Sequence, residues 1–124
     1  MNAHAQRPLS TRTSHDGDCV TIVCTGSAET ETFPELSAAL DAAHSDAVKS
    51  SARSVVADVR ALEFASSSCL KAFVTWLQRV RELEEGQRYK VRFRSNARHS
   101  WQRRSLGALA AFASGLVEIE TENA

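Results

Sequence analysis

A chain of 124 residues is long enough to bury the core of one ordinary domain without metals or disulfides. Apolar residues make up 43% and charged residues 24%, as in globular proteins, and no apolar run approaches the roughly 20 residues that span a bilayer. Fifteen lysines and arginines balance 15 aspartates and glutamates, so the net charge favours neither nucleic acid nor a membrane surface as partner.

Cysteine and histidine give no sign of a metal site or a disulfide framework. The three cysteines are an odd number without a CxxC pair, and the four histidines are scattered singly. Residues 1–14 contain no hydrophobic region of the kind a secretory signal has. We therefore expect a cytoplasmic protein with no metal, no cofactor and no membrane insertion.

The first part of the chain predicts a flexible end followed by a hairpin. Residues 1–8 are polar and are expected to be a flexible N-terminus, ahead of a single domain over residues 9–122. Residues 9–14 form a weak strand candidate, and the turn signal HDGD at 15–18 joins it to a stronger one. That second strand, CVTIVCTG at 19–26, alternates and is rich in β-branched residues.

The next run, residues 32–47, carries apolar residues at helical spacing. Thr32 and Glu35 have the spacing of a capping box, and Pro34 lies in the first turn, where its missing N–H is tolerated. The remaining patterns alternate between the strand and helix periods: a strand at 54–64, a helix at about 66–85 ended by Gly86, a strand at 89–95, a helix at about 98–112 and a strand at 116–121.

This order contains three strand–helix–strand units, which predict parallel pairing through right-handed crossovers after one antiparallel hairpin. Alternation within the strands indicates that helices cover one face of the sheet and that the other face is partly wet. We expect an α/β fold: a mixed, mostly parallel sheet of four to five strands with helices packed mainly on one face.

Three consecutive serines, Ser66, Ser67 and Ser68, stand where a strand ends and a helix begins. One serine suffices to cap the helix, which leaves at least one free hydroxyl. A helix N-terminus stabilises negative charge, so a phosphate on that hydroxyl would be well placed. Ser67 or the following Cys69 could instead be a nucleophile, but no motif supplies a base, and we expect no enzyme.

Residues 88–104 hold seven positive side chains and no acid. Tyr89 and Phe93 share the strand face opposite the charges, which predicts that they enter the core and do not stack on bases. We therefore expect no nucleic-acid partner. The charged face is expected to be solvated, to protect a sheet edge or to dock an acidic partner, and Trp101 is either a partner contact or a half-buried anchor.

The element order and the segment VVADVRALEFASSSCLKAFVTWLQRV, residues 55–80, resemble the STAS domain, the fold of bacterial anti-sigma-factor antagonists. The resemblance covers about residues 11–121. Two positions depart from the pattern of that family, because Ser66 stands where it has aspartate and Cys69 where it has glycine. The matching positions are Asp58, Leu62, Phe64, Ser67, Ser68 and Leu70.

The resemblance implies a non-catalytic switch. Ser67 would accept a phosphate, with Ser66 and Ser68 as alternative acceptors, from a partner serine kinase that also acts as anti-sigma factor. Phosphate would release that partner. The sequence does not decide whether the protein also forms a homodimer. The two departures leave an alternative, a STAS subunit or scaffold without phosphorylation, as in a lipid-transporting ABC system or a stress-sensing assembly. The residues expected to bind the partner are Ser66, Ser68, Cys69, Lys71 and Asp58.

Overall fold

The computed structural model describes residues 7–122. The structure contains the strands and helices that the sequence predicts, and most of their ends differ from the predicted ones by a few residues. In chain order they are β1 (Ser10–Asp16), β2 (Cys19–Ala28), the 3-10 turn η1 (Thr30–Thr32), α1 (Phe33–Lys49), β3 (Ser54–Ala65), α2 (Ser67–Arg81), the 3-10 turn η2 (Glu85–Gln87), β4 (Lys90–Asn96), α3 (Ser100–Phe112) and β5 (Val117–Glu122).

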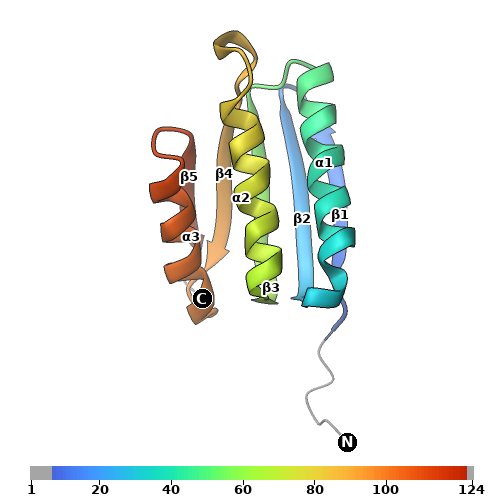
Figure 1. Cartoon of the computed structure of the whole chain (residues 1–124), viewed down its shortest axis with the longest axis vertical. Coiled ribbons are helices and arrows are strands. Elements are labelled where there is room, and N and C mark those ends of the chain that lie inside the picture. Colours follow the sequence, from blue (N-terminus) through green and yellow to red (C-terminus); the bar gives the residue numbers. More distant parts are fainter. Residues whose placement is uncertain (1–6, 123–124) are drawn as a thin grey trace, which may run out of the picture.

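The five strands form one sheet in the order β1-β2-β3-β4-β5. β1 and β2 are antiparallel and are joined by a tight turn in which Gly17 has a φ of 63°. The other neighbours are parallel, and α1, α2 and α3 cross over the same face of the sheet (Figure 1). The mixed α/β architecture expected from the sequence is confirmed, with five strands.

The core lies between the sheet and the three helices. In β3, Val55, Ala57 and Val59 are fully buried because alternate side chains point at the helices. From α2, Phe73 packs edge-on against Phe93 of β4 with ring centroids 5.8 Å apart. Phe93 is therefore a core residue, as the pattern of β4 predicts, and cannot stack on a nucleic-acid base.

The other sheet face carries charged residues, and several of them form ion pairs. Because β4 and β5 are parallel neighbours in register, arginines of the basic stretch lie beside glutamates that come late in the chain. Arg92 contacts Glu118 at 3.6 Å and Arg94 contacts Glu120 at 3.2 Å. These exposed pairs each stabilise the fold by less than about 1 kcal/mol, but they neutralise the charges of Arg92 and Arg94.

Two helix ends differ from the sequence prediction. Thr32 is the N-cap of α1, but its hydroxyl donates to the Glu29 carbonyl oxygen at 2.8 Å and so caps no helical N–H. The helix expected to run to residue 85 stops at Arg81, and Gly86 lies in η2. In both places a 3-10 turn forms beside the helix, and local propensity alone does not distinguish it from a helical turn.

The expected flexible segment 1–8 falls mainly on residues 1–6, which lie outside the described residues. Arg7 and Pro8 are described, and the Arg7 carbonyl oxygen accepts a hydrogen bond from the Ser27 N–H at 3.0 Å. Gly26 makes this approach possible, since a Cβ there would meet the Pro8 carbonyl oxygen at 2.1 Å and its φ is +85°. The chain is thus anchored to β2 from residue 7 onward.

A buried polar network links both long helices to the start of β4. The Trp76 indole of α2 donates to the Tyr89 hydroxyl at 2.8 Å, and that hydroxyl lies 2.7 Å from Nδ1 of His44 in α1. The indole can only donate, and Nδ1 is the one acceptor found for the Tyr89 hydroxyl within residues 7–122, so we assign the hydroxyl proton to Nδ1 and a neutral His44 with its proton on Nε2. Protonation of Nδ1 would break this arrangement.

Burial lowers the pKa of His44, and the positive charge of Arg79 in α2 lowers it further, while Asp41 acts in the opposite direction. The unfolded chain, with an ordinary imidazole pKa of 6.5, therefore takes up this proton first as the pH falls. The stability that neutral His44 contributes is present above pH 6.5 and is lost below it.

We expect the free energy of unfolding to fall between about pH 7.5 and pH 5.5, and to fall less in His44→Gln, whose amide oxygen can still accept from Tyr89. Urea titrations at both pH values measure the difference. His15→Gln, at an exposed position of β1, is the matched control and should behave as the wild type. An equal pH dependence in wild type and His44→Gln would contradict the assignment.

Candidate functional site

Ser66 caps the helix that follows the three-serine segment. It is the N-cap of α2, with extended backbone, and its hydroxyl oxygen accepts a hydrogen bond from the Cys69 N–H at 3.2 Å. Its own N–H donates to the Ala28 carbonyl oxygen at the end of β2, at 2.8 Å. Ser66 is 9% exposed, so its hydroxyl is committed to holding the start of α2 in place.

Ser67 is the first helical residue of α2 and is exposed. Its hydroxyl makes no side-chain hydrogen bond to any residue between 7 and 122. Ser68 is half-buried beside it. Of the three serines, Ser67 therefore offers the most accessible hydroxyl, at the helix end where open N–H donors stabilise a negative charge.

Cys69 points inward. It is 0% exposed and its thiol donates to the Glu29 carbonyl oxygen at 3.3 Å. A thiol in this position reaches neither a substrate nor the surface of a partner. We therefore remove Cys69 from the expected partner-binding residues, and the nucleophile alternative at this position has no structural basis.

Asp58 also lies away from the serines, on the sheet face opposite the helices. The Arg60 guanidinium donates to both of its carboxylate oxygens, at 2.9 and 2.8 Å. Burial alone would raise the pKa of Asp58, but the hydrogen bonds from the Arg60 side chain and N–H hold it below its ordinary value. Asp58 thus has an internal partner, and we remove it as well from the expected partner-binding residues.

A shallow groove of about 360 Å³ runs beside Ser67, between the starts of α1 and α2. The sequence singled out two of its residues, Ser68 and Lys71. Thr75 continues the same stripe of α2, at spacings of three and four residues, and helical periodicity could have identified it. We call it the α1–α2 groove; its lining residues are Thr30, Phe33, Pro34, Ser68, Lys71 and Thr75.

The other side of the groove was not expected. Phe33 and Pro34 begin α1, and Phe33 is 36% exposed. Phe64, just before the serines, is also exposed. In the sequence, Phe33 and Pro34 look like an ordinary helix start, which does not indicate a groove wall. The general rule that could have helped is that consecutive crossovers on one face bring the starts of neighbouring helices to the same end of the sheet (Figure 1).

A polar clamp fixes the start of α3 to the end of β3, close to the serines. The Gln102 amide nitrogen donates to the carbonyl oxygens of Val59 and Leu62, at 2.6 and 3.1 Å, and its amide oxygen accepts from the Asn96 N–H at 2.8 Å. The Trp101 indole donates to the same Leu62 oxygen at 3.2 Å. Trp101 is thus a half-buried anchor, and nothing in the sequence indicated the role of Gln102.

Two classes of feature are not seen in the described part of the chain. Within residues 7–122, no group of three or more histidine, cysteine, aspartate or glutamate side chains is arranged to hold a metal ion. Over the same residues, none of the helices combines the length and apolarity required to cross a membrane.

Comparison with known proteins supports the fold. No protein-family model matches the chain, and no match was found among curated proteins. A crystal structure of an anti-sigma factor antagonist from Mycobacterium paratuberculosis superposes with a TM-score of 0.66 at 18% identity, covering 90% of this chain and 86% of that one. The STAS fold implied by the sequence resemblance is thereby confirmed.

Ser66→Ala should lower the free energy of unfolding by about 1 kcal/mol, because the Cys69 N–H loses its acceptor. Ser67→Ala, one residue away, should change it by less than about 0.5 kcal/mol, since the exposed hydroxyl makes no bond to lose. Urea denaturation measures both. Equal losses in the two variants would contradict the division of roles between the serines.

Proposed function

We propose that the chain is a non-catalytic regulatory module that binds a protein partner, a serine kinase acting as anti-sigma factor, and that phosphorylation of Ser67 releases it. The observation that carries the proposal is an exposed hydroxyl at the start of α2, without a side-chain hydrogen bond to residues 7–122, in a chain with the fold of an anti-sigma factor antagonist. The contact surface comprises Ser67, the α1–α2 groove and Phe64.

Ser67 is favoured over its neighbours as the acceptor by accessibility. A kinase must reach the hydroxyl oxygen. That of Ser66 is buried in the cap and Ser68 is half-buried in the groove wall. Phosphorylation of Ser66 would also cost the stability that the cap provides.

A phosphate on Ser67 is compatible with the folded state. The first turn of α2 contains no acidic residue, and Lys71 lies one helical turn further along, at the spacing that favours an ion pair. The phosphate would act on the contact surface, where nearly two negative charges on the residue next to Ser68 of the groove would have to lose their water when a partner docks.

The two departures from the family pattern fit this mechanism. Ser66 supplies a capping oxygen where the family has a carboxylate, so the helix start is held without the charge. The side chain of Cys69 packs inward, so it occupies no space on the surface that a partner would approach. The alternative of a non-phosphorylated STAS subunit rests on the same two departures and is separated from the switch by experiment.

We expect phosphate transfer to Ser67 when the protein is incubated with ATP and each serine kinase of the anti-sigma type encoded in its source genome. Mass spectrometry maps the modified residue, and Ser67→Ala should abolish it. Ser67→Asp should weaken binding of that kinase about tenfold or more, equivalent to about 1.4 kcal/mol, in a calorimetric titration.

Ser114→Asp provides the control, since it adds the same charge at an exposed turn before β5. It should bind as the wild type does. If the wild type binds tightly and Ser67→Asp binds equally well, the non-phosphorylated subunit replaces the switch as the explanation. If no such kinase binds or modifies the protein, both the proposed partner and the proposed switch are wrong.

A further inference from the structure

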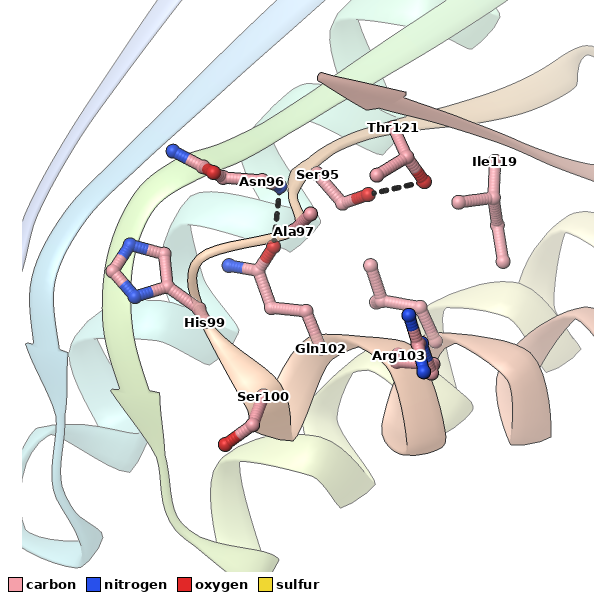
Figure 2. Close-up of a pocket in the computed structure, with 10 residues that line it drawn as sticks. Ser95, Asn96, Ala97, His99, Ser100, Gln102, Arg103, Ile119 and Thr121 are labelled. Carbon is pink, nitrogen blue, oxygen red and sulfur yellow. Dashed lines mark hydrogen bonds between the residues drawn. The ribbon is translucent and has the colours of Figure 1, made fainter. Parts of the chain in front are cut away.

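A second concave surface lies at the carboxyl end of β4, away from the α1–α2 groove. It is a cleft of about 530 Å³ between the start of α3 and the ends of β4 and β5. Figure 2 shows its side chains coming from α3 on one side and from the two strands on the other. The residues that matter below are Ser95, Arg103, Leu106, Ile119 and Thr121.

The cleft is positively charged. None of its lining residues is acidic, while the positively charged Arg103 lines it. The nearest glutamates of β5, Glu120 and Glu122, are paired with Arg94 and Arg60 on the other sheet face. In the part of the chain that the structure describes, no carboxylate lies within ion-pair distance of Arg103, so its charge is available to a ligand.

The remaining walls offer both hydroxyls and apolar surface. The Ser95 hydroxyl donates to Thr121 Oγ1 at 3.0 Å, with the Glu120 carbonyl oxygen as a longer second acceptor at 3.4 Å. While Ser95 donates to it, the Thr121 hydroxyl keeps its own proton for another acceptor. Leu106 is buried beneath the cleft, and Ile119 is 38% exposed at its side, where it is one of the few large apolar side chains open to solvent. An oxyanion and a compact apolar group can therefore both be accommodated.

We propose that this cleft binds a small organic anion, with a phosphate or carboxylate head held by Arg103 and the Thr121 hydroxyl and a compact apolar body against Leu106 and Ile119. Its volume lies within the roughly 300–1,000 Å³ usual for small-molecule sites. The concave shape favours a small molecule over the flat contact of an acidic protein. The proposal is independent of phosphorylation at Ser67.

Phenyl phosphate is the probe, titrated into isotope-labelled protein while backbone amide shifts are followed by NMR. We expect saturable shifts confined to residues 95–106 and 117–121. Benzoate should shift the same amides, which tests the carboxylate head, whereas neutral benzyl alcohol should bind more weakly than either. Inorganic phosphate, without the apolar body, should also bind more weakly.

Arg103→Gln should weaken phenyl phosphate about tenfold, because a charge-assisted hydrogen bond is lost. Arg104→Gln removes the same charge from the next residue, which does not line the cleft, and should change the affinity by less than about twofold, since an exposed charge is screened. Spectra of both variants show that the fold is retained.

Three results would overturn the proposal: no saturable shift with either probe, shifts centred outside the cleft, or equal weakening in the two arginine variants, which would indicate the general field of a basic surface. Binding of polyglutamate in the absence of phenyl phosphate binding would also overturn it and assign the face to an acidic protein partner.

Discussion

Three consecutive parallel crossovers place α1, α2 and α3 on one face of the sheet and start every helix at the same edge (Figure 1). The strand ends, helix starts and short polar segments that meet at that edge are far apart in the chain. The edge is held by specific bonds, from the Ser66 N–H to Ala28 and from Gln102 to the end of β3. Both the α1–α2 groove and the cleft at α3 exist because of this arrangement.

At this edge, structural and functional roles separate within a few residues. Ser66 and Cys69 turn inward, one as a helix cap and the other as a buried donor to Glu29. Ser67, between them, is exposed, and its hydroxyl has no side-chain hydrogen bond within the described part of the chain. In the function proposed above, a phosphate on Ser67 would change the surface without disturbing the cap that holds the start of α2.

The register between β4 and β5 decides which arginines of the basic stretch are paired. Parallel pairing of β4 with β5 sets Arg92 and Arg94 against glutamates, so this part of the basic stretch is neutralised within the domain. The arginines at the start of α3, Arg103 among them, have no such neighbours in the described chain. The basic stretch, residues 88–104, looks uniform in the sequence. In the structure, Arg92 and Arg94 are paired within the sheet, whereas Arg103 remains available to a ligand.

The sequence by itself determined the order of elements, the parallel crossovers, the buried Phe93 and a helix start within the three serines, because these depend on local periodicity and capping chemistry. It left Cys69 between a packed residue and a partner contact, and it did not identify Arg60 as the partner of Asp58. The groove wall at Phe33 and the clamp of Gln102 were also missed. Arg60, the partner of Asp58, lies only two residues away on the same strand. Only the tertiary structure decided the surroundings of Cys69, Phe33 and Gln102, since each depends on contacts between residues remote in the chain, which no local pattern records.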